Sequence, residues 1–316
     1  MSGVLVSGAT TPVSRALIEA LLAEGRTVLA VAVEERWPFE PHDRLHYHQV
    51  DLTRDRCIRE LLFGPARELG LTAIIHSAHH RRTSDSGRKI RALNVESTRC
   101  LVQLAERHPT IERFIYRSYA DVYRISPELP QLIGEDHPLE LGSWLPQVLR
   151  DRVEADLTVC TAMGMGSLSI AVLRCAEVCA SNSGSQLHDY LQSRVCLRPL
   201  GYDPMLDVLS IEDLVHALQL ALASDAQGIF NIGGRDVLPL SAAIGAAGKR
   251  EVAVPGPALG PLYRLRSLTR GSEFNYGSNR FRFHFSGVLD GRRAREVLGY
   301  VPEHPIDWPV PTYVRD

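Results

Sequence analysis

Residues 4–17 read VLVSGATTPVSRAL, and this stretch decides the fold. Apolar and small residues lead into a turn that begins at Gly8, and residues with helical apolar spacing follow it. This strand–turn–helix order is typical of the first βαβ unit of a dinucleotide-binding fold, in which a helix N-terminus faces the pyrophosphate. Only the first of the three usual glycines is present, because Thr11 and Ser14 occupy the other two positions. The stretch predicts a nucleotide-binding fold more clearly than it predicts tight nucleotide binding.

The composition indicates a soluble, cytoplasmic protein with a large core. The 316 residues are 45% hydrophobic, and the formal net charge of −2 gives no reason to expect a nucleic acid or a membrane as partner. We find no signal peptide and no apolar run of about 18 residues. The six cysteines are scattered, with no CxxC pair and no metal-ligand spacing, so we expect free thiols in a reducing compartment and no metal site.

β-rich runs alternate with helical patterns through the first half of the chain. We expect strands at 27–33, 45–50, 71–77, 113–117 and 168–174, and long helices at 88–107 and 145–162. This alternation predicts the α/β class, with a Rossmann-type, doubly wound parallel sheet and right-handed crossovers.

The regular alternation of strand and helix patterns ends after Arg174. Residues 1–174 are expected to form the dinucleotide-binding domain, and residues 175–316 a smaller, interleaved substrate lobe from which about 205–235 return to the first domain. A Pro/Gly-rich linker is expected at 254–261, and a last helix at 292–298 that ends at Gly299.

Several motifs stand in a fixed order along nearly the whole chain. Together they resemble the extended short-chain dehydrogenase/reductase family, the NAD-dependent epimerase/dehydratase group. The motifs are Gly8-Ala9-Thr10, Asp51-Leu52-Thr53, Ile75-His76-Ser77-Ala78, Asn94-Val95-Glu96-Ser97-Thr98, and the segments 114–123, 208–214, 229–234 and 290–302.

The resemblance implies NAD or NADP as cofactor. Glu34 favours NAD because a carboxylate accepts from the ribose hydroxyls, whereas Arg36 favours NADP because it can pair with a 2′-phosphate. Alternatively, either side chain is a solvated charge of the loop; we lean slightly towards NAD. The residues expected to hold the cofactor are Gly8, Thr10, Thr11, Pro12, Val13, Glu34, Arg36, Asp51, Leu52, Ser77, Ala78, His79, Asn94, Arg117 and Arg150.

The catalytic pair of the family is missing. In the family a tyrosine four residues before a lysine acts as general acid/base, and a glutamate usually follows the lysine by four residues. Glu154 therefore places Arg150 at the lysine position and Pro146 at the tyrosine position, while Tyr119 falls where a Ser or Thr would bond the reacting oxygen. Arg150 can supply charge and bond a ribose hydroxyl, but Pro146 cannot transfer a proton.

The absence does not depend on the alignment. The chain has two lysines, Lys89 and Lys249, and the residues four places before them are Asp85 and Gly245. No Tyr-x-x-x-Lys sequence exists anywhere in the chain.

Other side chains are candidates for the site. Tyr119 is either a displaced acid/base or a filler of the substrate space, and Tyr123 lies just beyond it. His79-His80-Arg81-Arg82 is expected to begin an exposed loop, without a third ligand that would make it a metal site.

An arginine- and phenylalanine-rich segment near the C-terminus offers further candidates. By the resemblance, Arg280 and Arg282 would contact a small-molecule or nucleotide-linked substrate. Alternatively, Phe281, Phe283 and Phe285 alternate as in a strand that packs them inward.

A homodimer through helices 88–107 and 145–162 is expected from the family and from their apolar side chains: Leu93, Val95, Leu101, Val102, Leu104, Val148, Leu149, Val153, Leu157 and Val159.

Three functions remain open at this point. The first is a catalytically degenerate family member that binds NAD(P) or a related ligand as a sensor, accessory subunit or carrier. The second is an active NAD(P)-dependent oxidoreductase or epimerase with a non-standard acid/base such as Tyr119. The third is a structural or assembly protein with an empty cleft.

Overall fold

The computed structural model describes residues 3–35, 39–270 and 273–309, and a parallel sheet forms its centre. Seven strands lie in the order β11-β7-β5-β4-β1-β2-β3, and every neighbouring pair runs parallel. The order reverses between β1 and β4, as it does at the switch point of a doubly wound sheet. The predicted Rossmann-type α/β fold is confirmed.

The strands of this sheet form where apolar runs occur in the sequence. All five residues of β1 and of β2 are buried, as expected for strands covered on both faces, whereas β3 is half-exposed at the sheet edge. The strands are β1 (Gly3–Ser7), β2 (Val28–Ala32), β3 (Leu45–Gln49), β4 (Leu71–His76), β5 (Arg113–Tyr119), β7 (Ser169–Cys175) and β11 (Gly228–Ile232).

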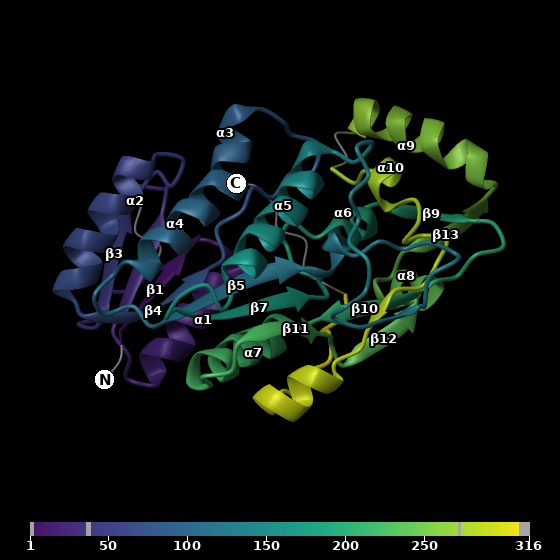
Figure 1. Cartoon of the computed structure of the whole chain (residues 1–316). Helices are drawn as coiled ribbons and strands as arrows, with labels where there is room; N and C mark the ends of the chain where they lie inside the picture. The colour runs from purple at the N-terminus through teal and green to yellow at the C-terminus, as the bar shows by residue number, and fades with distance from the viewer. Residues whose placement is uncertain (1–2, 36–38, 271–272, 310–316) are drawn as a thin grey trace.

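Helices cover both faces of the sheet (Figure 1). Helices α1 (Pro12–Ala23) and α7 (Ile211–Ala223) pack together on one face, and one core cluster lies beneath them. The opposite face carries α2, α4 and α5 over a second cluster. The elements on that face are α2 (Asp55–Leu61) with η1 (Leu62–Ala66), α3 (Arg88–Arg91) with η2 (Ala92–Glu96) and α4 (Ser97–Glu106), and α5 (Gln147–Ala162).

A smaller lobe stands beyond the carboxyl ends of the strands (right side of Figure 1). A third cluster, rich in aromatic side chains, forms its core. Its elements are β8 (Glu177–Val178), α6 (Gln186–Leu191), β9 (Val195–Pro199), β10 (Met205–Leu209), β12 (Asp236–Pro239), α8 (Leu240–Ala246), β13 (Arg250–Val254), α9 (Gly256–Arg270) and α10 (Tyr276–Asn279). Short segments complete the chain: η3 (Ala120–Val122), β6 (Leu132–Ile133), β14 (Val288–Leu289) and η4 (Ala294–Leu298), which Gly299 ends in a left-handed conformation.

Two expectations for the C-terminal third were wrong. The linker predicted at 254–261 is instead the end of β13 and the first turns of α9, because Leu259 and Tyr263 lie one turn apart and are both buried in the lobe core. Residues 281–285 form turns rather than a strand, and of the three phenylalanines only Phe283 is fully buried.

The helices expected to join two copies use their apolar side chains inside the chain. Nine of the ten named side chains are buried or packed against the second core cluster or the first, and only Leu157, at 38%, is exposed. The outer face instead carries ion pairs of Arg91 with Glu154 (2.7 Å) and of Arg99 with Glu96 (2.5 Å). A homodimer stays a prediction, and a contact through this face would be largely polar.

Within the described ranges, no helix combines the length and the apolar character that crossing a bilayer requires.

Candidate functional site

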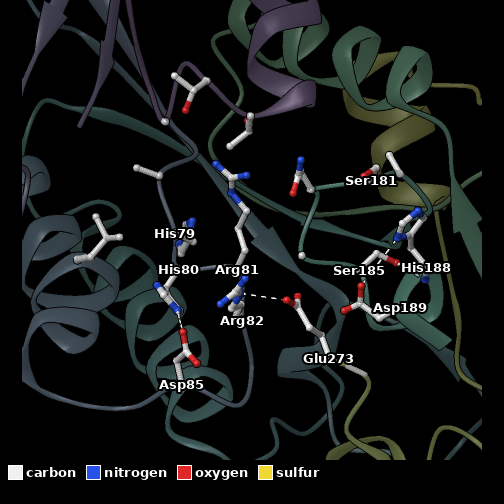
Figure 2. A pocket seen from close by; sticks show the side chains of 18 of the residues that line it. His79, His80, Arg81, Arg82, Asp85, Ser181, Ser185, His188, Asp189 and Glu273 are labelled. Carbon is white, nitrogen blue, oxygen red and sulfur yellow. Dashed lines mark hydrogen bonds and ion pairs between the residues drawn. The ribbon is translucent and has the colours of Figure 1, made fainter. Parts of the chain in front are cut away.

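A cavity of about 1130 Å³ lies at the carboxyl edge of the parallel sheet. This is the edge at which open α/β sheets bind their ligands. One wall comes from the turns after β1, β2, β3 and β4, and the other from the loop before α6 and from α6 itself. Figure 2 shows His79, His80 and Arg82 on one side and Ser185, His188 and Asp189 on the other. An ion pair of Arg82 with Glu273 (3.1 Å) bridges the two sides.

Gly8 lets the backbones after β1 and β4 touch at the floor of this cavity. Its φ is +69°, and a Cβ added there would lie 2.9 Å from Ala78 Cα. No other residue type fits that space without moving the backbone. The close approach of Ala78 therefore explains why position 8, the first glycine of the predicted turn, is glycine. Gly8, Thr10, Thr11 and Ala78 line the cavity.

The N-terminus of α1 offers fewer donors than a glycine turn would. Thr11 is the N-cap residue, and its Oγ1 accepts from the Ser14 N–H at 3.1 Å. Pro12 has no N–H, and Val13 and Ser14 are buried rather than cavity-lining. One donor of the first turn is therefore absent and another is bonded within the turn, which weakens the site as a pyrophosphate cradle.

The turns after β2 and β3 carry the acidic side chains predicted for the adenosine half. Glu34, Asp51 and Leu52 all line the cavity. Asp51 Oδ1 accepts from the Thr53 hydroxyl (2.6 Å), and this bond lowers the pKa of the carboxyl group. Arg36 lies outside the described residues.

A buried relay fixes β1 against β4. Ser7 Oγ accepts from the backbone N–H groups of Ser77 (3.0 Å) and Ala78 (3.2 Å), so its own proton goes to His76 Nδ1 at 2.7 Å. His76 Nε2 then carries the ring proton and donates to Thr98 (2.9 Å). Burial lowers the pKa of His76 to about 3, so the ring is neutral near pH 7. Neither Ser77 nor Asn94, which accepts from the His80 N–H (2.8 Å), lines the cavity.

The end of β5 holds an aromatic side chain between two arginines. The Cζ atoms of Arg152 and Arg117 lie 3.9 Å and 4.8 Å from the centre of the Tyr119 ring. Arg117 Nη1 donates to the Tyr119 hydroxyl at 3.3 Å, and Arg152 pairs with Asp121. Tyr119, Tyr123, Arg117 and Arg152 line a second, smaller cavity, which shares Gly184 and Ser185 with the large one.

The arginine predicted at the lysine position does not lie at either cavity. Arg150 is exposed on α5 and lines neither cavity, whereas Arg152 is 97% buried (3% exposed) and faces the end of β5. Glu154, which set the register of the alignment, lies on the outer face and pairs with Arg91. A signal for Arg152 lies on the helix itself: Leu149 and Arg152 are three residues apart and share one face of α5.

His79 was wrongly expected to begin an exposed loop. The ring is 8% exposed, lies over the Tyr119 edge and bonds the Tyr116 hydroxyl through Nε2 at 2.8 Å. Burial first, and then the electrostatic influence of His76 and of the Arg152 and Arg117 guanidinium groups, lower the pKa of His79 well below its usual value. A neutral, buried imidazole therefore lines the large cavity and contacts Tyr119, which lines the smaller one.

The two arginines predicted to contact substrate differ in position. Arg282 lines the second cavity, and its Nη1 lies 3.9 Å from Glu177 Oε2. Arg280 is exposed and lines neither cavity.

The match to a known protein family covers the part of the chain that forms the sheet and most of the large cavity. The model of the NAD dependent epimerase/dehydratase family matches residues 4–233. The chain belongs to this family. Its Rossmann sheet and its large cavity both lie mainly within the matched residues.

A curated relative of this epimerase/dehydratase chain is the uncharacterized protein Rv0501 of Mycobacterium tuberculosis. The two are 29% identical over 238 residues, which cover 73% of this chain and 61% of the relative. The chain thus spans about three fifths of the length of the curated relatives it matches.

Solved structures share the fold at low identity. The Bordetella bronchiseptica enzyme WbmH, in complex with NAD+, superposes with a TM-score of 0.74 at 16% identity, over 96% of this chain and 94% of that one. The UDP-glucose 4-epimerase of Thermotoga maritima, solved with UDP-glucose, gives 0.70 at 14% identity, over 95% and 94% of the two chains.

Proposed function

We propose that this epimerase/dehydratase family member binds an NAD-type dinucleotide in the large cavity and lacks the hydride chemistry that a Tyr–Lys pair supports. The shape of the floor supports binding, since Gly8 lets the turn after β1 pack directly on the backbone of Ala78, and both residues line the cavity. Glu34 and Asp51 also line this cavity, which supports their assignment to the adenosine half of the dinucleotide. Bound dinucleotide would bring a nicotinamide ring capable of accepting or giving a hydride.

The observation that carries the proposal is the composition of the α5 face at the end of β5. From α5, Leu149 and Arg152 line the second cavity, and Leu145 lines it from the segment before the helix, so this side offers a fixed positive charge and no group that exchanges a proton near neutral pH. The role expected for such a protein is that of a sensor, accessory subunit or carrier.

The relative affinity for NAD+ and NADP+ tests whether Glu34 contacts the adenosine ribose. The Glu34 carboxylate accepts from a ribose 2′-hydroxyl and repels a 2′-phosphate, so we expect NAD+ to bind at least about tenfold, or about 1.4 kcal/mol, more tightly than NADP+. Glu34→Gln should narrow that ratio, while Glu35→Gln, whose side chain does not line the cavity, should leave it unchanged. Thermal-shift titrations give the Kd values for NAD+ and for NADP+, because a ligand at about 100 times its Kd stabilises the folded state by about 2.7 kcal/mol. Equal binding of both dinucleotides by all three proteins would contradict the placement of Glu34.

One contact favours a second candidate function, an enzyme that uses Tyr119 as its acid/base. Arg117 Nη1 donates to the Tyr119 hydroxyl, and a charge-assisted hydrogen bond of this kind stabilises the negative charge that a departing proton leaves behind.

Chromatographic analysis of the sugar nucleotide after incubation with UDP-glucose, as the trial substrate, and NAD+ separates the two functions. A binding protein should show no turnover. If turnover is seen, Tyr119→Phe should lower it by at least about a hundredfold. Tyr123→Phe is the matched control, since it also lines the second cavity but bonds Asn231 (2.7 Å). Turnover that survives Tyr119→Phe would remove Tyr119 from consideration.

A further inference from the structure

The second cavity contains buried polar atoms that the chain does not satisfy. Within the described residues, Arg117 Nε, Arg152 Nε and Nη2, and Asp121 Oδ1 are buried and have no hydrogen-bond partner. Arg117 and Arg152 are 4% and 3% exposed, and both line the cavity together with Asp121. Buried donors and acceptors of this kind are rare in folded proteins, and here they gather around one space.

Three arginines and three carboxylates line this cavity, but one arginine has no ion-pair partner among the described residues: the six are Arg117, Arg152, Arg282, Asp121, Glu140 and Glu177. Glu140 accepts from the Gly142 N–H. Asp121 pairs with Arg152, and Glu177 accepts from Ser185 and faces Arg282. Arg117 forms no ion pair within the part of the chain that the structure describes, and its contacts are to the Tyr119 ring and hydroxyl. A buried guanidinium without a counter-charge is costly, so the cavity favours an anion.

The size and the unpaired acceptor restrict which anion fits. The cavity holds about 60 Å³, which is space for a few water-sized groups rather than for a sugar ring. The free oxygen of Asp121 would repel a phosphate dianion but accepts from a hydroxyl.

We propose that this cavity binds a carboxylate group that carries a neighbouring hydroxyl. The free N–H groups of Arg117 and Arg152 donate to the carboxylate, and Asp121 Oδ1 accepts from the hydroxyl. The cavity adjoins the large one at Gly184 and Ser185, so the inference deepens the proposed function by naming the chemistry of a second ligand beside the dinucleotide.

Three small probes test the proposal without any dinucleotide. Glycolate has both groups, glycolamide lacks the charge, and acetate lacks the hydroxyl. In ligand-observed NMR titrations of the full chain, we expect glycolate to bind at least tenfold more tightly than glycolamide and several-fold more tightly than acetate. Equal affinity for glycolate and glycolamide, or no binding of glycolate at high millimolar concentration, would overturn the proposal.

The variant Arg117→Met distinguishes an arginine that binds the ligand from one that only supports the fold. We expect this variant to lose at least tenfold in glycolate affinity and to melt at a higher temperature, because it removes an unpaired buried charge and keeps the volume. Arg280→Met, at an exposed arginine outside both cavities, should change neither property. If Arg117→Met weakens NAD+ binding and leaves glycolate binding intact, the cluster serves the dinucleotide and the inference is wrong. Since NAD+ is titrated separately, failure of the dinucleotide proposal is distinguishable from failure of this one.

Discussion

Asp156→Ala will destabilise the folded chain by about 3–5 kcal/mol, which is the expected cost of leaving one member of a buried ion pair without its partner. Asp156 and Arg174 are 0% and 4% exposed at their side chains, and Arg174 Nη2 lies 2.7 Å from Asp156 Oδ1. Asp156 Oδ2 also accepts from Arg174 Nε (3.1 Å) and from Ser118 (2.5 Å). Removing the carboxylate orphans a guanidinium and a hydroxyl between α5, β5 and β7.

Denaturant unfolding measures this loss, and two further variants isolate its cause. Glu60→Ala breaks an exposed pair with Arg56 (2.7 Å) and should leave the free energy of unfolding nearly unchanged, because solvent screens such a pair. The double variant Asp156→Leu/Arg174→Met should recover much of the stability, because an apolar pair of similar volume often replaces a buried ion pair at little cost. A loss below about 1 kcal/mol for Asp156→Ala would contradict the buried-charge explanation.

Gly8→Ala will reduce NAD+ affinity by more than about tenfold, or about 1.4 kcal/mol. The new Cβ would lie 2.9 Å from Ala78 Cα and 3.1 Å from Ala78 N, so the ends of β1 and β4 must separate. These two segments form the cavity floor, and their separation displaces the turn that would face the pyrophosphate.

Gly70→Ala is the matched control for this prediction. Gly70 also has a left-handed φ, of +60°, but an added Cβ there meets no atom within 4 Å. Both variants carry the conformational cost of an alanine at positive φ, which is about 1–2 kcal/mol. Only Gly8→Ala should lose NAD+ binding by calorimetry on folded protein; unchanged affinity in Gly8→Ala would show that the floor tolerates a side chain.

The fold was predictable because its signals are local. The continuous apolar runs of β1 and β2 and the glycine that follows β1 identify a buried parallel strand and its turn without any tertiary information. The last helix and its glycine end were predictable for the same reason. The Pro/Gly content of residues 254–261 was misleading, since the lobe core buries Leu259 and Tyr263 and thereby stabilises a helix that local propensity disfavours.

The site was less predictable because contacts distant in sequence build it. A motif register anchored on Glu154 selected an exposed arginine, although Arg152 lies on the buried face of the same helix. The burial of His79 depends on Tyr116, 37 residues away, and the pairing of Asp156 depends on Arg174, 18 residues away. Charged residues within an apolar helix stripe were the one sequence signal that could have found Arg152 and Asp156.

Calorimetric titration of NAD+ into the purified chain tests the central claim, that the cleft accepts a dinucleotide although the family's catalytic pair is gone. We expect saturable heat that fits one dinucleotide per chain. No saturable heat from NAD+ or NADP+ at millimolar concentration would contradict a dinucleotide site and favour a structural role for an empty cleft.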